Sequence, residues 1–408
     1  MTDRQLKCRR RRAHGFSLVE ILVGLAIGML AVIIIMQVFA VNEATKRTTT
    51  GGADATTNGT TALYLTEREV AMAGWGLESA LYLGRPDTAN PIVPGCETYN
   101  HYCGGASCSG ADWSLAPVSI TDGGTGPDSI TLRYFADPED ANFVPSPTAT
   151  VYSNAVVVSG ATSVPTLKVS TNFSCKKGDL VLVSDPTGAT CTLVQVSDVP
   201  GTTPGDLTLP HLSGTDSPYN NPDWDTASSG GKPPIVTSTT TATCFAPASD
   251  GPTSRRIFSV DTTDRVLKRF DSATATTSAI ASGIVDMQAQ YGIAADGSQV
   301  VSDWVDATGG AGWDNPVPKA GTSGITTKNR LQNIKAVRIA LVARSSEYQK
   351  PSGSTCDATS TSVLTAGSTG WSTWATFDDS GYPADWQCYR YREFEITVPV
   401  RNIIWGSP

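Results

Sequence analysis

The strongest constraint on this chain is an uncharged apolar segment close to its N-terminus. No charged residue occurs between Ile21 and Asn42, a stretch of 22 residues. As an α-helix this stretch would be about 33 Å long, which matches the hydrocarbon core of a bilayer, roughly 30 Å thick. The sequence therefore predicts a transmembrane helix over 16–42, and it excludes a chain that folds wholly in water.

A basic leader precedes the apolar segment. Residues 1–15 contain six Lys and Arg and one acidic residue, Asp3, for a net charge of +5. Lys and Arg beside a span stay on the cytoplasmic side, so everything after Asn42 is expected on the other side of the membrane. A secretory signal peptide would instead have a shorter apolar region followed by a small-residue cleavage site.

The carboxylate of Glu20 lies inside the start of the apolar segment. Acidic residues are rare at such positions and usually have a partner, although a carboxylate can also sit at the level of the lipid headgroups. The stretch Gly15-Phe16-Ser17-Leu18-Val19-Glu20 resembles the class III signal of type IV prepilins and pseudopilins.

This resemblance implies a processing site and an assembly residue. A prepilin peptidase would cut after Gly15 and methylate the new N-terminal Phe16, leaving 1–15 as a cleaved leader. Glu20 would then neutralise the N-terminal amine of an adjacent subunit through a charge-assisted hydrogen bond and fix the subunit register.

The residues that follow the span favour a helix with a soft segment. Residues 47–61 are rich in Thr and Gly, and Gly51 and Gly52 each cost a helix about 1 kcal/mol relative to Ala. We expect the helix to resume near Ala62 and to end near Ala73, so that 43–76 comprises a soft segment and an amphipathic half. The expected core contacts of this half are Leu63, Val70 and Trp75.

The rest of the chain, 77–408, reads as a β-rich head. Alternating or apolar runs bounded by turn residues predict strands at 129–135, 155–158, 179–184, 191–196, 257–260, 266–270, 284–291, 336–344 and 391–398. Two stretches rich in Pro, Gly, Ser and Thr, 199–256 and 302–330, are expected to be loops or insertions. The fold class is therefore α+β.

Three late segments, 283–293, 334–345 and 391–402, resemble in that order the strands of PilW-type minor pilins and of pseudopilin J. The resemblance implies a type IV pilin fold, in which the long N-terminal helix packs on an antiparallel sheet, here with an insertion around 95–255. It implies a minor pilin that primes pilus assembly within a tip complex. The alternatives are a pseudopilin J-like component of type II secretion and a tip adhesin that binds through the insertion.

The same resemblance implies partners and a location. The partners would be other minor pilins, the major pilin, the prepilin peptidase, the inner-membrane assembly platform and a large tip adhesin. The chain would cross the inner membrane once, with a periplasmic head, before reaching the surface pilus. Nucleic acid is not an expected partner, because residues 16–408 contain 24 basic and 37 acidic residues.

Eight cysteines fall in the exported part, an oxidising compartment where disulfides form. They are Cys96, Cys103, Cys108, Cys175, Cys191, Cys244, Cys356 and Cys388. Eight cysteines allow 105 pairings, and the sequence does not select one. Cys175 with Cys191 across a hairpin is one plausible local pair, and Cys356 with Cys388 would resemble the C-terminal disulfide loop of pilins.

Catalysis and cofactor binding are not expected. The chain contains three His and no G-x-S-x-G, Walker A, G-x-G-x-x-G or H-E-x-x-H motif. A zinc site at Cys96, Cys103, Cys108 and His101 is the main alternative to disulfides, but it lacks the Cys-x2-Cys spacing of structural zinc sites. We therefore predict no metal and no enzyme activity.

Overall fold

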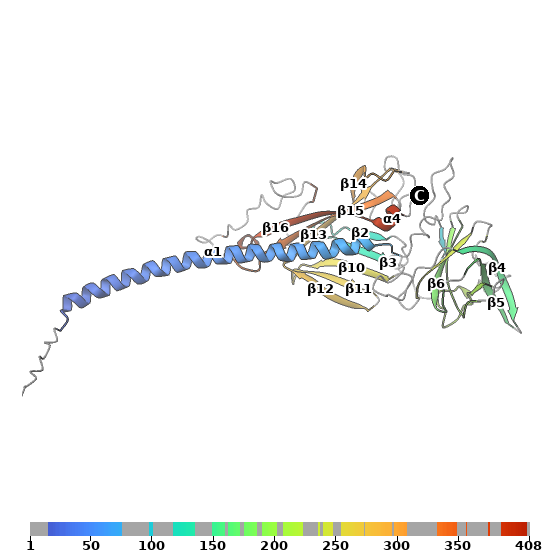
Figure 1. Cartoon of the computed structure of the whole chain (residues 1–408), viewed down its shortest axis with the longest axis horizontal. Coiled ribbons are helices and arrows are strands. Elements are labelled where there is room, and N and C mark those ends of the chain that lie inside the picture. The colour runs from blue at the N-terminus through green and yellow to red at the C-terminus, as the bar shows by residue number, and fades with distance from the viewer. Residues whose placement is uncertain are drawn as a thin grey trace, which may run out of the picture.

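The computed structural model describes residues 15–75, 98–100, 117–134, 149–159, 162–171, 175–185, 190–201, 207–222, 236, 240–247, 254–272, 274–295, 298–307, 333–348, 356, 374–375 and 385–405. One long helix dominates the molecule (Figure 1). Its first half projects alone, two sheets surround its second half, and a further group of strands lies at the end farthest from the projecting half (Figure 1).

The helix α1 runs without a break from Leu18 to Met72, over 55 residues. It is the one helix of the described chain that is long and apolar enough to cross a bilayer. The expectation of a soft segment at 47–61 was wrong, because these residues are helical throughout.

The Thr and Gly residues of this part of α1 have defined contacts. The hydroxyls of Thr45, Thr49, Thr56 and Thr57 donate to the carbonyls four residues earlier, at 2.8–3.0 Å. Two glycines allow the sheet to approach closely. A Cβ on Gly51 would lie 3.1 Å from that of Ser345, and one on Gly59 would overlap the ring of Phe394. The helix propensity lost at these glycines is offset by packing against the sheet.

The head contains two antiparallel sheets beside the second half of α1. The four-stranded sheet has the order β14 (Asp303–Asp306), β13 (Ile284–Ile293), β15 (Ile334–Arg344), β16 (Tyr391–Pro399). The five-stranded sheet has the order β12 (Thr276–Ser282), β11 (Val266–Asp271), β10 (Ser254–Asp261), β3 (Ser129–Tyr134), β2 (Val118–Thr121). Both sheets and α1 contribute to one hydrophobic core.

A stripe of small residues faces this core from α1. The buried positions recur every three or four residues, as expected for one helix face, and comprise Gly51, Ala55, Gly59, Ala62, Thr66, Glu69, Val70 and Ala73. Val70 is fully buried and Leu63 packs at the edge of the core, as expected. Trp75 is 42% exposed, so its expected core role was wrong. It follows Gly74, whose φ of +80° ends the helix and turns the chain away.

A third sheet of seven strands has its own core. Its order is β1 (Thr98–Asn100), β7 (Thr190–Gln195), β6 (Asp179–Asp185), β9 (Thr241–Pro247), β4 (Ala149–Ser159), β5 (Thr162–Val169), β8 (Thr208–Pro210). All ladders are antiparallel except that of β1 with β7.

All nine expected strands overlap strands of the structure, but the two expected loop regions were partly wrong. The segment 199–256 contains β8, β9 and the start of β10, and 302–330 begins with β14. β8 and β14 have three and four residues, too few for an alternating pattern to stand out. β9 is rich in Thr and Ala and has no apolar run.

The Gly59 contact gives a stability test. Gly59→Ala should destabilise the head by about 1–3 kcal/mol, because the new methyl overlaps the Phe394 ring. Gly52→Ala is the matched control: nothing lies within 4 Å of its added Cβ, so it should be neutral or stabilising by up to about 1 kcal/mol. Urea unfolding followed by circular dichroism measures both. Equal effects of the two substitutions would contradict the close approach.

The buried carboxylate of Asp128 connects the two sheets of the head. Its oxygens accept the backbone N–H of Gly123 at 2.9 Å and of Ala289 in β13 at 2.8 Å. Burial raises the pKa of Asp128 to about 6, although the two N–H groups act in the opposite direction. The folded state thus holds this proton more tightly than the unfolded state does.

This linkage predicts a pH dependence. Because the folded pKa is raised, the contribution of Asp128 to stability is lost as the pH rises through about 6, by on the order of 3 kcal/mol. Asp128→Asn cannot ionise, and its missing acceptor adds a constant offset. The unfolding free energy of wild type minus that of the variant should therefore fall as the pH rises from about 4 to about 6.5, and should be constant above that. A difference that is constant over this range would show that Asp128 titrates normally.

Candidate assembly site

The expected processing site lies just before the helix. Gly15, Phe16 and Ser17 precede α1, and Ser17 is its N-cap in extended conformation with φ −69° and ψ 143°. Phe16 is 78% exposed, and among the described residues no atom outside the adjacent residues lies within 4 Å of a Cβ built on Gly15. The peptide bond between Gly15 and Phe16 is therefore accessible and not held in a helix.

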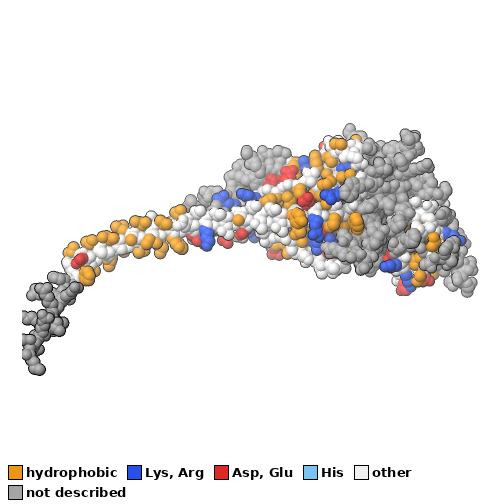
Figure 2. Space-filling model, viewed as in Figure 1, with side chains coloured by type: hydrophobic (Ala, Val, Ile, Leu, Met, Phe, Trp, Pro, Cys, Tyr) orange, Lys and Arg blue, Asp and Glu red, His pale blue; other side chains and the backbone are white. Residues whose placement is uncertain are grey.

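Glu20 occupies the first turn of α1. A carboxylate there is favoured by the partial positive charge at the helix N-terminus. The residues from Ile21 to Val41 that follow are exposed, and Figure 2 shows orange apolar side chains all along this part of α1, outside the head. Such a surface needs lipid or other apolar helices around it, because an exposed apolar helix of this length is not stable in water.

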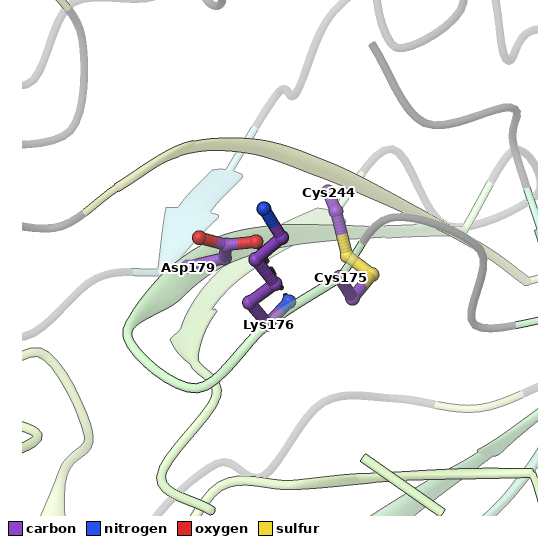
Figure 3. The surroundings of a disulfide bond; sticks show 4 residues. All are labelled: Cys175, Lys176, Asp179 and Cys244. Atoms are coloured by element: carbon purple, nitrogen blue, oxygen red, sulfur yellow. Dashed lines mark hydrogen bonds between the residues drawn. A yellow bond between two sulfur atoms is a disulfide. The ribbon is translucent and has the colours of Figure 1, made fainter. Parts of the chain in front are cut away.

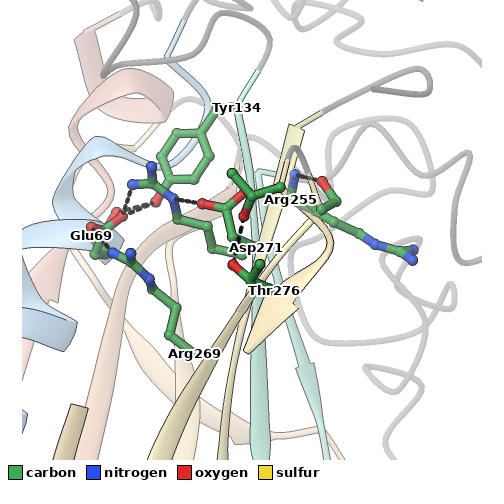
Figure 4. Close-up of polar contacts among 9 residues, drawn as sticks. Glu69, Tyr134, Arg255, Arg269, Asp271 and Thr276 are labelled. Carbon is green, nitrogen blue, oxygen red and sulfur yellow. Dashed lines mark hydrogen bonds and ion pairs between the residues drawn. The ribbon is translucent and has the colours of Figure 1, made fainter. Parts of the chain in front are cut away.

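A buried polar cluster fastens the other end of α1 to the five-stranded sheet (Figure 4). Glu69 on α1 accepts hydrogen bonds from Tyr134 Oη and Arg256 Nη1, both at 2.7 Å. Its second oxygen lies 3.3 Å from Arg269 Nη1. Arg256 Nε also donates to Asp271 at 3.0 Å. The cluster thus joins the helix to β3, β10 and β11.

The charges in this cluster balance. Two carboxylates, Glu69 and Asp271, face two guanidinium groups, Arg256 and Arg269. Burial lowers the pKa of Arg256, but the hydrogen bond and charge of Glu69 outweigh it and raise the pKa overall. Burial and the charge of Glu69 also raise the pKa of Tyr134 well above its usual value. Arg256 therefore stays charged and Tyr134 stays a hydrogen-bond donor.

A side chain from the end of the chain caps α1. Asn402, in the short helix α4 (Arg401–Trp405), donates from Nδ2 to the carbonyls of Met72 at 3.1 Å and Ala73 at 2.9 Å. The Met72 carbonyl also accepts the backbone N–H of Trp75 at 3.1 Å. Asn402 thus adds donors for carbonyls at a helix end, where the regular intrahelical partners are missing. The last described residues thereby hold the point at which α1 stops.

One expected disulfide differs in the structure. Cys175 is bonded to Cys244, not to Cys191 (Figure 3). Cys175 precedes β6, whereas Cys191 pairs with Ser184 near the opposite end of that strand, so the hairpin keeps Cys175 and Cys191 apart. Cys244 on the neighbouring strand β9 lies opposite Val181, close to the start of β6.

A disulfide joins Cys356 to Cys388. Cys388 lies in the 3-10 turn η5 (Trp386–Cys388), just before β16. Of the four remaining cysteines of the expected set, Cys191 lies in β7. The other three, Cys96, Cys103 and Cys108, lie outside the described residues, as does His101. Within the described part of the chain, no three His, Cys, Asp or Glu side chains are grouped closely enough to hold a metal ion.

Glu69 and its partners were not among the residues predicted from the sequence. The available signal was an acidic residue within the apolar stripe of a helix, between Thr66 and Val70. A charge at such a position needs a buried counter-charge. The positions of Arg256 and Arg269 in β10 and β11 could not be matched to Glu69 without the sheet order, since they lie 187 and 200 residues away.

Comparison with known families agrees with this architecture. The family model described as type IV pilus-assembly protein W matches residues 239–402, and the prokaryotic N-terminal methylation motif matches residues 10–36. The two matches support a type IV pilus-related, pilin-like protein and are consistent with the PilW type. No curated protein and no solved structure matches it.

The matched regions coincide with the parts described above. The methylation motif covers Gly15, Phe16 and Glu20, and the PilW region contains the four-stranded sheet and β10–β12. The chain thus combines a long apolar helix with antiparallel sheets around the second half of that helix, an α+β arrangement consistent with the pilin fold.

The Glu69 cluster predicts a large effect of one substitution. Glu69→Gln removes the charge that neutralises Arg256 and should cost about 3 kcal/mol of unfolding free energy, because a buried cation is left unpaired. Glu67→Gln on the same helix is the matched control, and as a change outside the buried face it should stay within about 0.5 kcal/mol. Chemical denaturation of both variants measures the difference. Equal stabilities would show that the cluster does not hold α1.

Proposed function

We propose that this PilW-type protein is a minor pilin that primes type IV pilus assembly within a complex of minor pilins. The observation that carries the proposal is the combination of an accessible Gly15–Phe16 bond, Glu20 four residues later, and an apolar helix joined directly to the head. A peptidase can cut such a chain after Gly15. The apolar helix can then exchange its contacts with lipid for contacts with the helices of other subunits.

The proposed mechanism is noncovalent after processing. Cleavage after Gly15 leaves a cationic amine on Phe16, and Glu20 of one subunit neutralises the amine of the next. This ion pair fixes the axial register, and the apolar residues from Leu18 to Val41 cover one another in the bundle. Prepilin peptidase, the inner-membrane assembly platform, the major pilin, other minor pilins and a large tip adhesin are the proposed partners.

The head is proposed to reach the periplasm and then the cell-surface pilus. The basic leader favours a cytoplasmic N-terminus, because positive charge beside a span stays on that side. The buried cluster at Glu69 and the cap at Asn402 make the head move with α1 as one body. A force or contact at the head is therefore transmitted to the span.

A genetic comparison tests the proposal against a role in type II secretion. Deleting the gene should abolish or strongly reduce surface pili and twitching, with secreted exoproteins unchanged. Restoring the wild-type gene should recover piliation, whereas Glu20→Ala should not, since it lacks the carboxylate that pairs with the amine. Normal piliation together with lost secretion would assign the protein to a secretion system instead.

A further inference from the structure

The end of the head nearest the projecting half of α1 is formed where β15 ends and β16 begins (Figure 1). We call this surface the head base, and its residues are Arg344, Ser345, Tyr348, Tyr389 and Arg390. A Cβ on Gly51 would lie 3.1 Å from that of Ser345, so the head base lies beside Gly51 of α1. The N–H of Ser345 donates to the Arg390 carbonyl at 2.7 Å, which holds the two segments together.

The head base carries two arginines without an acidic partner. Neither Arg344 nor Arg390 forms an ion pair with any residue that the structure describes. Arg390 is exposed, whereas Arg344 is half-buried. Burial lowers the pKa of Arg344, and the nearby charge of Arg265 lowers it further. An anionic group from outside the chain would therefore be favoured at this surface.

Two tyrosines lie beside these arginines. The guanidinium carbon of Arg344 is 3.8 Å from the centre of the Tyr389 ring, and the ring of Tyr348 meets that of Tyr389 edge-on, with centroids 5.6 Å apart. Tyr348 is 40% exposed. Tyrosine is enriched where proteins meet the lipid headgroups, because its ring is apolar and its hydroxyl is polar.

Acidic side chains are also present at this end of the head. Glu347 is exposed, and Asp54 accepts a hydrogen bond from Ser346 Oγ at 2.6 Å. The head base is thus not a uniformly basic patch. Its mixture of arginine, carboxylate and tyrosine suits a layer that contains phosphates, polar groups and nearby apolar chains, rather than a single dissolved anion.

The continuity of α1 fixes the distance between the head base and the bilayer. Gly51 follows Val41, at the end of the apolar segment, by ten residues, or about 15 Å along the helix. The headgroup layer on each side of a bilayer is about 5–8 Å thick, which leaves a gap of roughly 7–10 Å. Long side chains and a helix tilt of about 20° close such a gap. Figure 2 shows blue Lys and Arg side chains where α1 enters the head.

We propose that the head base binds the lipid headgroup layer of the membrane that α1 spans. Arg344 and Arg390 contact lipid phosphates, whose oxygens accept the N–H groups of arginine in pairs, and Tyr348 lies among the headgroups. This contact sets the orientation of the head on the membrane. It requires that the apolar half of α1 lies in a bilayer, and it does not depend on the proposed minor-pilin role.

Arginine labelling with phenylglyoxal, mapped by mass spectrometry, tests this with the full chain. One sample is in nanodiscs of equal parts phosphatidylcholine and phosphatidylglycerol, and the other is in maltoside micelles, which contain no phosphate. Arg390 should be labelled at least about threefold more slowly in the nanodiscs, because lipid phosphates shield it and stabilise its charge.

Arg401 is the internal control in the same molecule. It is exposed, and its neighbour Asn402 contacts Met72, about 30 Å along α1 from Gly51. This distance is several Debye lengths at ordinary salt, so the labelling rate of Arg401 should differ less than about 1.5-fold between the two samples.

Two variants with the same loss of charge extend the test. Arg344→Gln removes one phosphate contact and should reduce the protection of Arg390 by about half or more. Lys176→Gln removes an exposed charge just before β6, in the part of the chain that forms the seven-stranded sheet, and should leave the protection unchanged. Both variants should keep the circular dichroism spectrum of the wild type.

Equal labelling rates of Arg390 in nanodiscs and micelles would overturn the proposal, as would equal slowing of Arg401 in nanodiscs. Inorganic phosphate added to the micelles separates the two sources of phosphate. If it slows the labelling of Arg390 as much as the nanodiscs do, the site binds a dissolved anion and the proposal is also overturned. None of these readouts involves pilus assembly, so failure here and failure of the proposed function are distinguishable.

Discussion

The structure depends on one helix that must satisfy two environments. The first half of α1 is apolar on all sides, whereas the second half buries one narrow stripe against the head. Because α1 is continuous from Leu18 to Met72, the span and the part of the helix that packs in the head form one element. The head therefore holds the helix at several levels: by Phe394 over Gly59, by the Glu69 cluster and by the Asn402 cap.

These contacts explain why unfavourable helix residues are retained. Gly51 and Gly59 reduce helix propensity, but any side chain at Gly59 would collide with Phe394. The same reasoning applies to Glu69, whose burial is costly without Arg256 and Tyr134. Polar anchors of this kind give the helix one register against the sheet, because a shift by one residue would leave Arg256 without its counter-charge.

Local patterns in the sequence identified the span, the processing motif, the long strands and the α+β class. They failed where the outcome depends on contacts distant in sequence. The soft segment was inferred from the propensity of Gly51 and Gly52, and packing on the sheet overrides that propensity. Likewise, pairing Cys175 with Cys244 requires knowledge that β9 lies beside β6, which no local pattern carries. Short strands such as β8 and β14 leave too little periodicity to detect.

The proposed function requires that the leader is removed, so that the exported protein begins just before α1. Mass spectrometry of the chain purified from the membrane of its native host measures this directly. The account predicts a mature protein that begins at Phe16 with one methyl group on its amine, and that has lost the leader of net charge +5. A chain that retains the leader, or that begins at any other residue, would contradict it.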